Sequence, residues 1–92
     1  MKTPALFRHN TNVGIVEIRE IVSAGSRLYE LWFEDGDGDR FLERLATFFE
    51  LLDRLMAGNY DAAAGWPIST LVPAELGDWH VCPSEIRNPP AG

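Results

Sequence analysis

The chain has 92 residues, with 14 Asp and Glu against 8 Lys and Arg and a formal net charge of −6. Apolar residues make up 46% of it, which is enough for the core of one soluble domain and too much for a disordered chain. The acidic balance disfavours direct nucleic-acid binding and anionic membranes, and no apolar stretch approaches the roughly 20 residues that span a bilayer. The single cysteine, Cys82, cannot form an internal disulfide and no signal-peptide run is present, so we expect a reducing, cytoplasmic setting.

The first half of the sequence predicts a β-hairpin. Residues 13–22 are rich in β-branched side chains, residues 27–34 alternate, and a Gly-containing turn at 23–26 separates them. A short edge strand is expected before the hairpin, at residues 5–8. In the second hairpin strand Leu28 and Trp32 share one face and Tyr29 and Phe33 the other, and the pattern leaves open which pair faces a helix.

The next segment predicts one long amphipathic helix. Its apolar positions recur at spacings of three and four. They are Phe41, Leu42, Leu45, Phe48, Phe49, Leu52, Leu55 and Met56. A helix of about 17 residues would be roughly 25 Å long and would cross a small sheet. Asp37 or Asp39 is expected to cap its N-terminus, and Gly58-Asn59 to end it.

The remaining segments complete a small α+β domain over residues 1–83. A third strand is expected at residues 68–72, a single helical turn at 73–76 and a short fourth strand at 79–82. Residues 84–92 are rich in proline and are expected to be a disordered tail. The predicted fold class is therefore α+β, with an antiparallel β-sheet of three to four strands and one long helix packed across one face.

Four carboxylates, from Glu34, Asp35, Asp37 and Asp39, lie within six residues of the chain. Their alternation with glycine is similar to the start of a calcium-binding EF-hand loop, which needs Gly at position 6 and Glu at position 12. Counted from Asp35, those positions hold Arg and Ala. The sequence therefore favours a solvated turn and predicts no metal site, with a weak Ca²⁺ or Mg²⁺ site as the alternative.

No catalytic residue and no cofactor is predicted, so we do not expect an enzyme. His80 and Cys82 are two apart on an expected strand, but they lack the further ligands that zinc requires and are poorly placed as a nucleophile and its base. Phosphate-binding loops, nucleophile elbows and dinucleotide-binding glycine motifs are missing from the sequence.

Three tryptophans, Trp32, Trp66 and Trp79, are many for a chain of this length. The helix would cover one face of the sheet and leave the other to be covered by the C-terminal segment, buried in a dimer, or used to bind a partner. Tryptophan is favoured as an interface anchor. Under the alternative interpretation, Trp66 and Trp79 fold back and cover the second face themselves.

These observations predict a small acidic protein-binding module, an inhibitor that occupies a surface of a larger protein partner. Anti-CRISPR, antitoxin and immunity proteins act in this physical manner, and acidic mimicry of nucleic acid would direct such a module to a nucleic-acid-binding complex. The expected contact residues are Glu34, Asp35, Asp37, Asp39, Trp32, Trp66 and Trp79. The alternatives are a small-ligand or divalent-metal-binding domain and a homo-oligomeric structural subunit, such as a homodimer.

Overall fold

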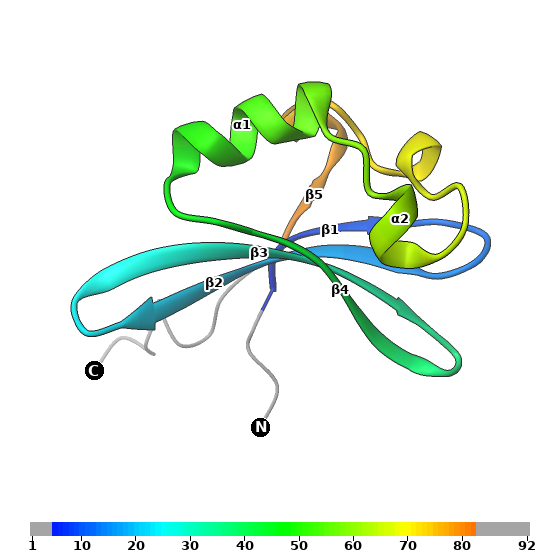
Figure 1. Ribbon diagram of the computed structural model, residues 1–92, viewed down its shortest axis with the longest axis horizontal. Coiled ribbons are helices and arrows are strands. Elements are labelled where there is room, and N and C mark those ends of the chain that lie inside the picture. Colours follow the sequence, from blue (N-terminus) through cyan, green and yellow to red (C-terminus); the bar gives the residue numbers. More distant parts are fainter. Residues whose placement is uncertain (1–4, 83–92) are drawn as a thin grey trace, which may run out of the picture.

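The computed structural model describes residues 5–82 and shows an α+β fold built on a five-stranded antiparallel sheet (Figure 1). Its strands are β1 (Ala5–Asn10), β2 (Ile15–Ser23), β3 (Ser26–Asp35), β4 (Gly38–Leu45) and β5 (His80–Val81). Their order in the sheet is β4-β3-β2-β1-β5, so the first four strands form a meander and β5 returns from the far end of the sequence to pair with β1. The sheet has one more strand than the upper limit predicted from the sequence.

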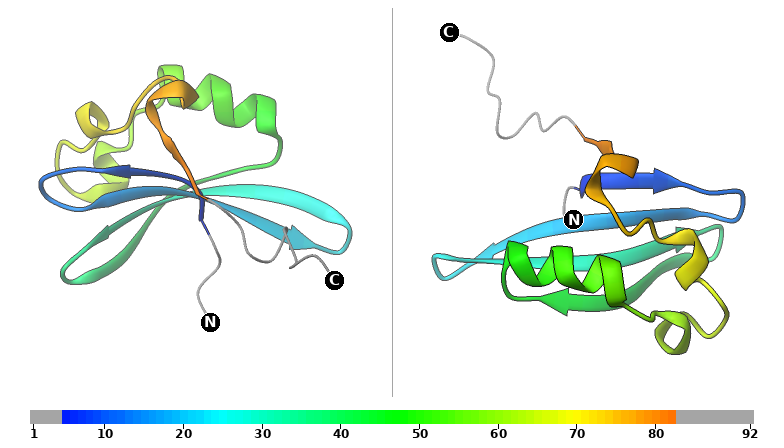
Figure 2. Two further views of the ribbon diagram at one scale, coloured as in Figure 1. Left: turned by 180° about the vertical axis from the view of Figure 1, so that it is seen from behind. Right: turned by 90° about the horizontal axis from the view of Figure 1, so that it is seen from above.

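The helical segments all lie on one side of the sheet, where they form a second layer (Figure 2). They are α1 (Phe48–Ala57), α2 (Asp61–Ala64) and the short 3₁₀ turns η1 (Ser69–Leu71) and η2 (Leu76–Asp78). None of these helices is long and apolar enough to cross a membrane.

The predicted hairpin is confirmed as β2 and β3, which pair antiparallel along their whole length. Its two central turn residues, Ala24 and Gly25, both have positive φ, at 51° and 80°. Positive φ at both positions is characteristic of the tight turn whose twist matches that of the flanking strands. The β2–β3 pair thereby forms the centre of the sheet.

The prediction of one long helix is wrong in its first part, because residues 38–45 form β4. A β-bulge interrupts the pairing of β4 with β3 at Leu42, so the strand carries one extra residue there. Leu42 and Leu45 are therefore both buried although they are three positions apart, a spacing that resembles a helix. Phe41 lies on the opposite face and is 42% exposed.

Helix α1 has 10 residues and begins at Phe48, so neither Asp37 nor Asp39 caps it. The cap is Thr47, whose Oγ1 accepts a hydrogen bond from the backbone N–H of Glu50 at 3.1 Å. The Glu50 carboxylate in turn accepts from the backbone N–H of Ala46 at 2.9 Å. The two contacts resemble a capping box, except that the Glu50 carboxylate binds the amide of the residue before the cap and not that of Thr47 itself. The helix ends before Gly58, as predicted.

Several predictions that involve the C-terminal part need correction. The expected third strand at 68–72 is the 3₁₀ turn η1, and its apolar residues Ile68 and Val72 are buried in the core across that turn. The predicted fourth strand exists but covers only His80–Val81, and because it pairs outside β1, β1 is not an edge strand. The expected helical turn at 73–76 lies later, at η2. The predicted tail at 84–92 lies outside the described residues.

The core fills the space between the sheet and the helical layer. Side chains on the helix side of β2 and β3 alternate inward and meet the buried side of α1 and the later turns. The buried apolar residues are Val16, Ile18, Tyr29, Leu31, Phe33, Leu42, Leu45, Leu51, Leu55, Tyr60, Ala64, Ile68, Val72 and Trp79. The second face of the sheet therefore contributes its own, separate set of side chains.

Candidate interaction surface

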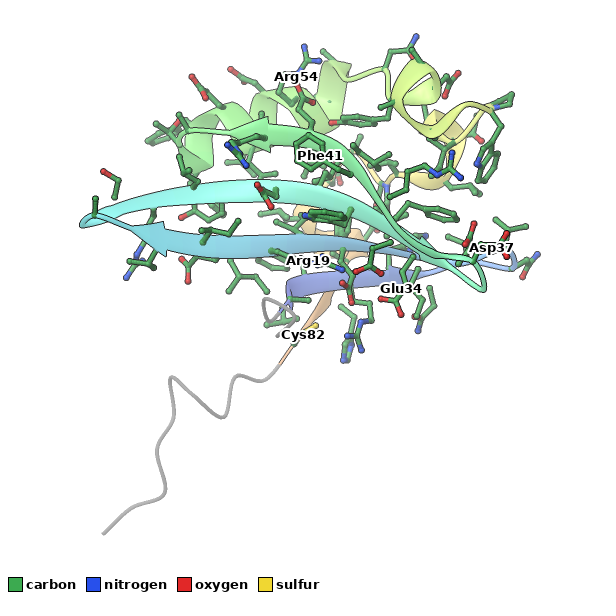
Figure 3. All side chains as sticks on the ribbon, turned by 60° about the horizontal axis from the view of Figure 1, so that its bottom comes forward. Arg19, Glu34, Asp37, Phe41, Arg54 and Cys82 are labelled. Atoms are coloured by element: carbon green, nitrogen blue, oxygen red, sulfur yellow. The ribbon has the colours of Figure 1, made fainter. Side chains whose placement is uncertain are left out.

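The sheet face turned away from the helices is covered by no element within residues 5–82, and we call it the open face (Figure 3). The strand register places alternate residues of β1 to β4 on it. They are Arg8, Ile15, Glu17, Arg19, Ile21, Leu28, Glu30, Trp32, Glu34, Asp39, Phe41 and Arg44. Of the two pairs left open by the sequence, Leu28 and Trp32 therefore belong to the open face, while Tyr29 and Phe33 are in the core.

An ion-pair network runs across three strands of the open face. Glu17 on β2 is 2% exposed, and each of its carboxylate oxygens is bound by a different arginine. Oε1 accepts from Nε and Nη2 of Arg19 at 3.0 and 2.8 Å, and Oε2 accepts from Nε and Nη2 of Arg8 at 3.2 and 2.9 Å. Arg19, 4% exposed, also reaches Asp39 on β4 at 3.1 Å. These forked, charge-assisted contacts hold β1, β2 and β4 in one register.

Trp32 is at the centre of the open face. The guanidinium of Arg19 lies 4.5 Å from the centre of its ring, a cation–π contact. Phe41 packs edge-on against the indole, with ring centres 5.4 Å apart. The indole N–H donates to Glu30 Oε1 at 3.0 Å, and Arg44 binds the other oxygen of Glu30 at 2.7 Å. The face thus presents aromatic surface between ion pairs whose charges are already matched.

The acidic residues predicted as a site lie at the end of this face, at the β3–β4 turn. Asp35 and Asp37 occupy the turn, where Asp35 Oδ1 accepts from the backbone N–H of Asp37 at 2.8 Å, a local contact typical of aspartate in turns. Glu34 and Asp39 are opposite each other on the open face. Because Asp39 is bound to Arg19, the acidic group divides into a paired part on the face and a part at the turn, where Asp35 is half-buried and Asp37 is exposed.

Trp66 and Trp79 lie on the helix side of the sheet, so the interpretation that they cover the second face is wrong. Trp79 is 5% exposed, contacts His9 with ring centres 6.1 Å apart, and donates from its indole to the carbonyl of Pro73 at 3.1 Å. Trp66 is half-buried and packs edge-on against Phe33 at 5.5 Å. Burial and these contacts leave Trp79 without surface to offer a partner in this conformation.

Two groups with shifted pKa values connect the helices, away from the open face. Burial, and next the negative charge of Glu43, raise the pKa of Tyr60 to about 12, and its hydroxyl donates to the carbonyl of Arg54 at 2.9 Å. Hydrogen bonds from the side chain and backbone of Ser69 lower the pKa of Asp61 below its usual 3.8. Both contacts fix the path of the chain after α1.

The residues considered as metal ligands are dispersed. His80 lies on the outermost strand and Cys82 comes directly after its end, with Cys82 Sγ 4.0 Å from the carbonyl oxygen of His80. Within residues 5–82, no three His, Cys, Asp or Glu side chains are grouped as ligands of one ion.

Most of the open face was missed from the sequence. Glu17, Arg19, Glu30 and Arg44 are not among the contact residues that the sequence predicts, and Phe41 is placed by its spacing among the apolar positions of a helix. A signal for these residues was present in the sequence. In β2 the charged Glu17 and Arg19 flank Ile18, and this segment pairs with Glu30, Leu31 and Trp32 of β3. Aligning those two segments in antiparallel register would have placed opposite charges side by side.

Comparisons with known proteins give no further guidance: no protein-family profile, no curated protein and no solved structure matches the chain.

Proposed function

We propose that this protein is a binding module that attaches to a larger protein through its open face and acts by occupying the surface it covers. The observation that carries the proposal is the Trp32–Phe41 pair, which lies on a sheet face that no element of residues 5–82 covers. Aromatic and arginine side chains are the ones most often found at the centre of interfaces. The role proposed is binding, with no catalytic step.

The open face has the chemistry of such a surface. Its charges are matched by neighbours, so a partner need not leave a lone charge buried when it excludes water. The ion-pair network also fixes the long side chains before binding, which lowers the entropy lost on association. The half-buried Asp35 and the exposed Asp37 at the β3–β4 turn add an acidic end that favours a basic surface beside the contact.

The experiment starts with the partner, captured from lysate of the native host on the immobilised protein and identified by mass spectrometry. Affinity of the purified pair is then measured for Phe41→Ala and for the matched control Phe49→Ala. Phe49 is also exposed, at 80%, but it lies on α1 in the opposite layer. We expect Phe41→Ala to weaken binding about 10-fold or more, as truncation of an interface anchor does, and Phe49→Ala to leave it unchanged. Equal effects of the two changes would refute the open face as the contact surface.

The acidic turn is tested separately, because its contribution is electrostatic. Replacing Asp35 and Asp37 by Lys should weaken binding and reduce its dependence on salt. The control replaces Glu75 and Asp78, exposed acids near η2, in the same way. If the two double variants bind equally, the acidic turn takes no part in recognition, and a partner with a basic groove is excluded.

A further inference from the structure

The outer edge of β4 is paired with no described strand, since β4 is the first strand in the sheet order. A strand at an edge presents backbone N–H and C=O groups that can pair with another strand. β4 has eight residues, Gly38–Leu45, long enough for several ladder hydrogen bonds. The side chains of β4 determine which strand can pair with this edge.

The charges of β4 are complementary to those of a second β4 running antiparallel. When the strand is paired with its own copy about a two-fold axis between Phe41 and Leu42, Asp39 of each copy lies opposite Arg44 of the other. In the same register Arg40 of each copy lies opposite Glu43 of the other. Directly opposite residues of unlike charge stabilise a strand pair.

The β-bulge brings the two members of each charged pair onto one face, whereas the central residues Phe41 and Leu42 project from opposite faces. In a regular strand, residues 39 and 44 would lie on opposite faces, because their spacing is odd. The extra residue at Leu42 places Asp39 and Arg44 together on the open face and Arg40 and Glu43 together on the helix side. Each predicted ion pair between copies therefore joins two side chains that project from the same face.

A groove beside the second half of β4 provides the place for the arginine of a second copy. It has a volume of about 490 Å³ and is lined by Glu43, Arg44, Leu45, Glu50, Asp53 and Arg54. Glu43 uses Oε1 to accept from Nε of Arg54 at 2.9 Å, while its Oε2 is buried and has no hydrogen-bond partner. A buried carboxylate oxygen without a donor costs free energy, and a guanidinium placed there would remove that cost.

Arg40 can supply the donor. Its Nη1 donates to the carbonyl of Ala64 at 2.5 Å, and no other hydrogen bond from this guanidinium reaches a side chain or backbone group within residues 5–82. Arginine has five N–H donors, so the contact to Ala64 and a contact to the second copy's Glu43 can be made together.

We propose that two copies of this chain associate through their β4 strands, with Arg40 of each entering the groove of the other against Glu43. The two five-stranded sheets then join into one of ten strands. This goes beyond the proposed function, because it concerns the edge of the sheet and not its open face. The dimer places the two open faces side by side as one longer surface for the larger partner.

The first experiment uses the unmodified protein. Its molar mass is measured by light scattering from about 1 to about 200 µM, and hydrogen exchange is followed by mass spectrometry at both ends of that range. We expect the mass to double and deuterium uptake in residues 38–45 to fall with concentration, while uptake in β1 and β5 stays constant. A monomer at the highest concentration, or protection elsewhere than β4, would overturn the proposal.

The second experiment reverses charges. Arg40→Glu should raise the dimer dissociation constant about 10- to 100-fold, since two favourable pairs become repulsive. A second variant, E43R combined with R54E, keeps an ion pair inside each copy and should also be monomeric. Arg27→Glu, at the far end of the sheet, is the matched control and should dimerise normally.

Mixing the two interface variants is the decisive step. In the mixed pair, Arg40→Glu brings a carboxylate against the arginine introduced at 43, and the unmodified Arg40 meets the unmodified Glu43, so a heterodimer should form with the original affinity. Native mass spectrometry distinguishes it from either homodimer. If the two variants are folded by circular dichroism and the mixture stays monomeric, the proposed register is wrong. If either variant fails to fold, the hydrogen-exchange result on the unmodified protein decides the question.

Discussion

Replacing Glu17 by Gln tests whether the open face is held together as its geometry indicates. The change keeps the size of the side chain and removes a charge that is 2% exposed and bound by two arginines through four hydrogen bonds. The amide nitrogen of Gln would face one of the guanidinium groups donor to donor. If that group is Arg19, which is 4% exposed, its remaining ion-pair partner is Asp39 at 3.1 Å. Removing one partner of a buried ion pair typically costs about 3–5 kcal/mol, and the isosteric amide should cost about 2–3 kcal/mol.

Arg8→Ala is the control against which the loss of stability in Glu17→Gln is compared. Arg8 binds the same carboxylate, but its side chain is 44% exposed, so its loss should cost under about 1 kcal/mol. Both variants are measured by urea unfolding, with the slope checked for two-state behaviour. For a domain of this size, about 2–3 kcal/mol corresponds to a melting temperature lower by roughly 10–20 °C. A Glu17→Gln variant no less stable than Arg8→Ala would refute the idea that the network is buried and rigid.

Four further substitutions test individual elements. Leu42→Ala should cost about 2–4 kcal/mol and Phe41→Ala about 1 kcal/mol or less, because the bulge buries only the first; equal losses in thermal unfolding would contradict the strand assignment. Ala24→Asn should raise stability by about 0.5–1 kcal/mol, because Asn tolerates the positive φ of the β2–β3 turn better than Ala, and a lower melting temperature would argue against that turn. The lowered pKa of Asp61 means that its ionised form stabilises the fold above pH 3.8, an effect lost as pH falls through the depressed value. Asp61→Asn should therefore be less stable than the unmodified protein at pH 7, with a difference that narrows in acid; a constant difference would show that the charge does not matter.

The sequence was sufficient for the β2–β3 hairpin and for the end of α1, where local signals and the final structure agree. It was misleading at β4, because a β-bulge at Leu42 produces a spacing of three between buried residues, and periodicity alone cannot separate this from a helix. It was also misleading at residues 68–72, where β-branched residues occupy a 3₁₀ turn fixed by hydrogen bonds from Tyr60 and to Asp61. Those partners are eight and nine positions away, so no local propensity could reveal them.

Of the residues on the open face, some were predicted from the sequence and others were not. Trp32 and the acids of the β3–β4 turn were found from composition and position, and the structure places them on or at the end of the open face. Phe41 could not be found, since its assignment depended on the incorrect helix. The role of Arg19 depends on a contact with Asp39, 20 positions along the chain, and on packing over a tryptophan in the neighbouring strand. Both become visible only when the strand register is known.

The pairing of β5 with β1 has a consequence for the order in which the chain can fold. Strands β2, β3 and β4 are joined by two-residue turns and can pair as soon as they leave the ribosome, because their contacts are close in sequence. The β1–β5 pairs join Phe7 to Val81 and Arg8 to His80, with more than 70 residues between them, and the entropy of closing that loop must be met before they form. Trp79, which completes the core next to β5, arrives at the same late moment. When β4 has just left the ribosome, the nascent chain therefore contains the paired strands β2 to β4 without the helices that cover their apolar side. The apolar surface of the sheet is then exposed, and a chaperone or a second copy has its best access to it in this interval.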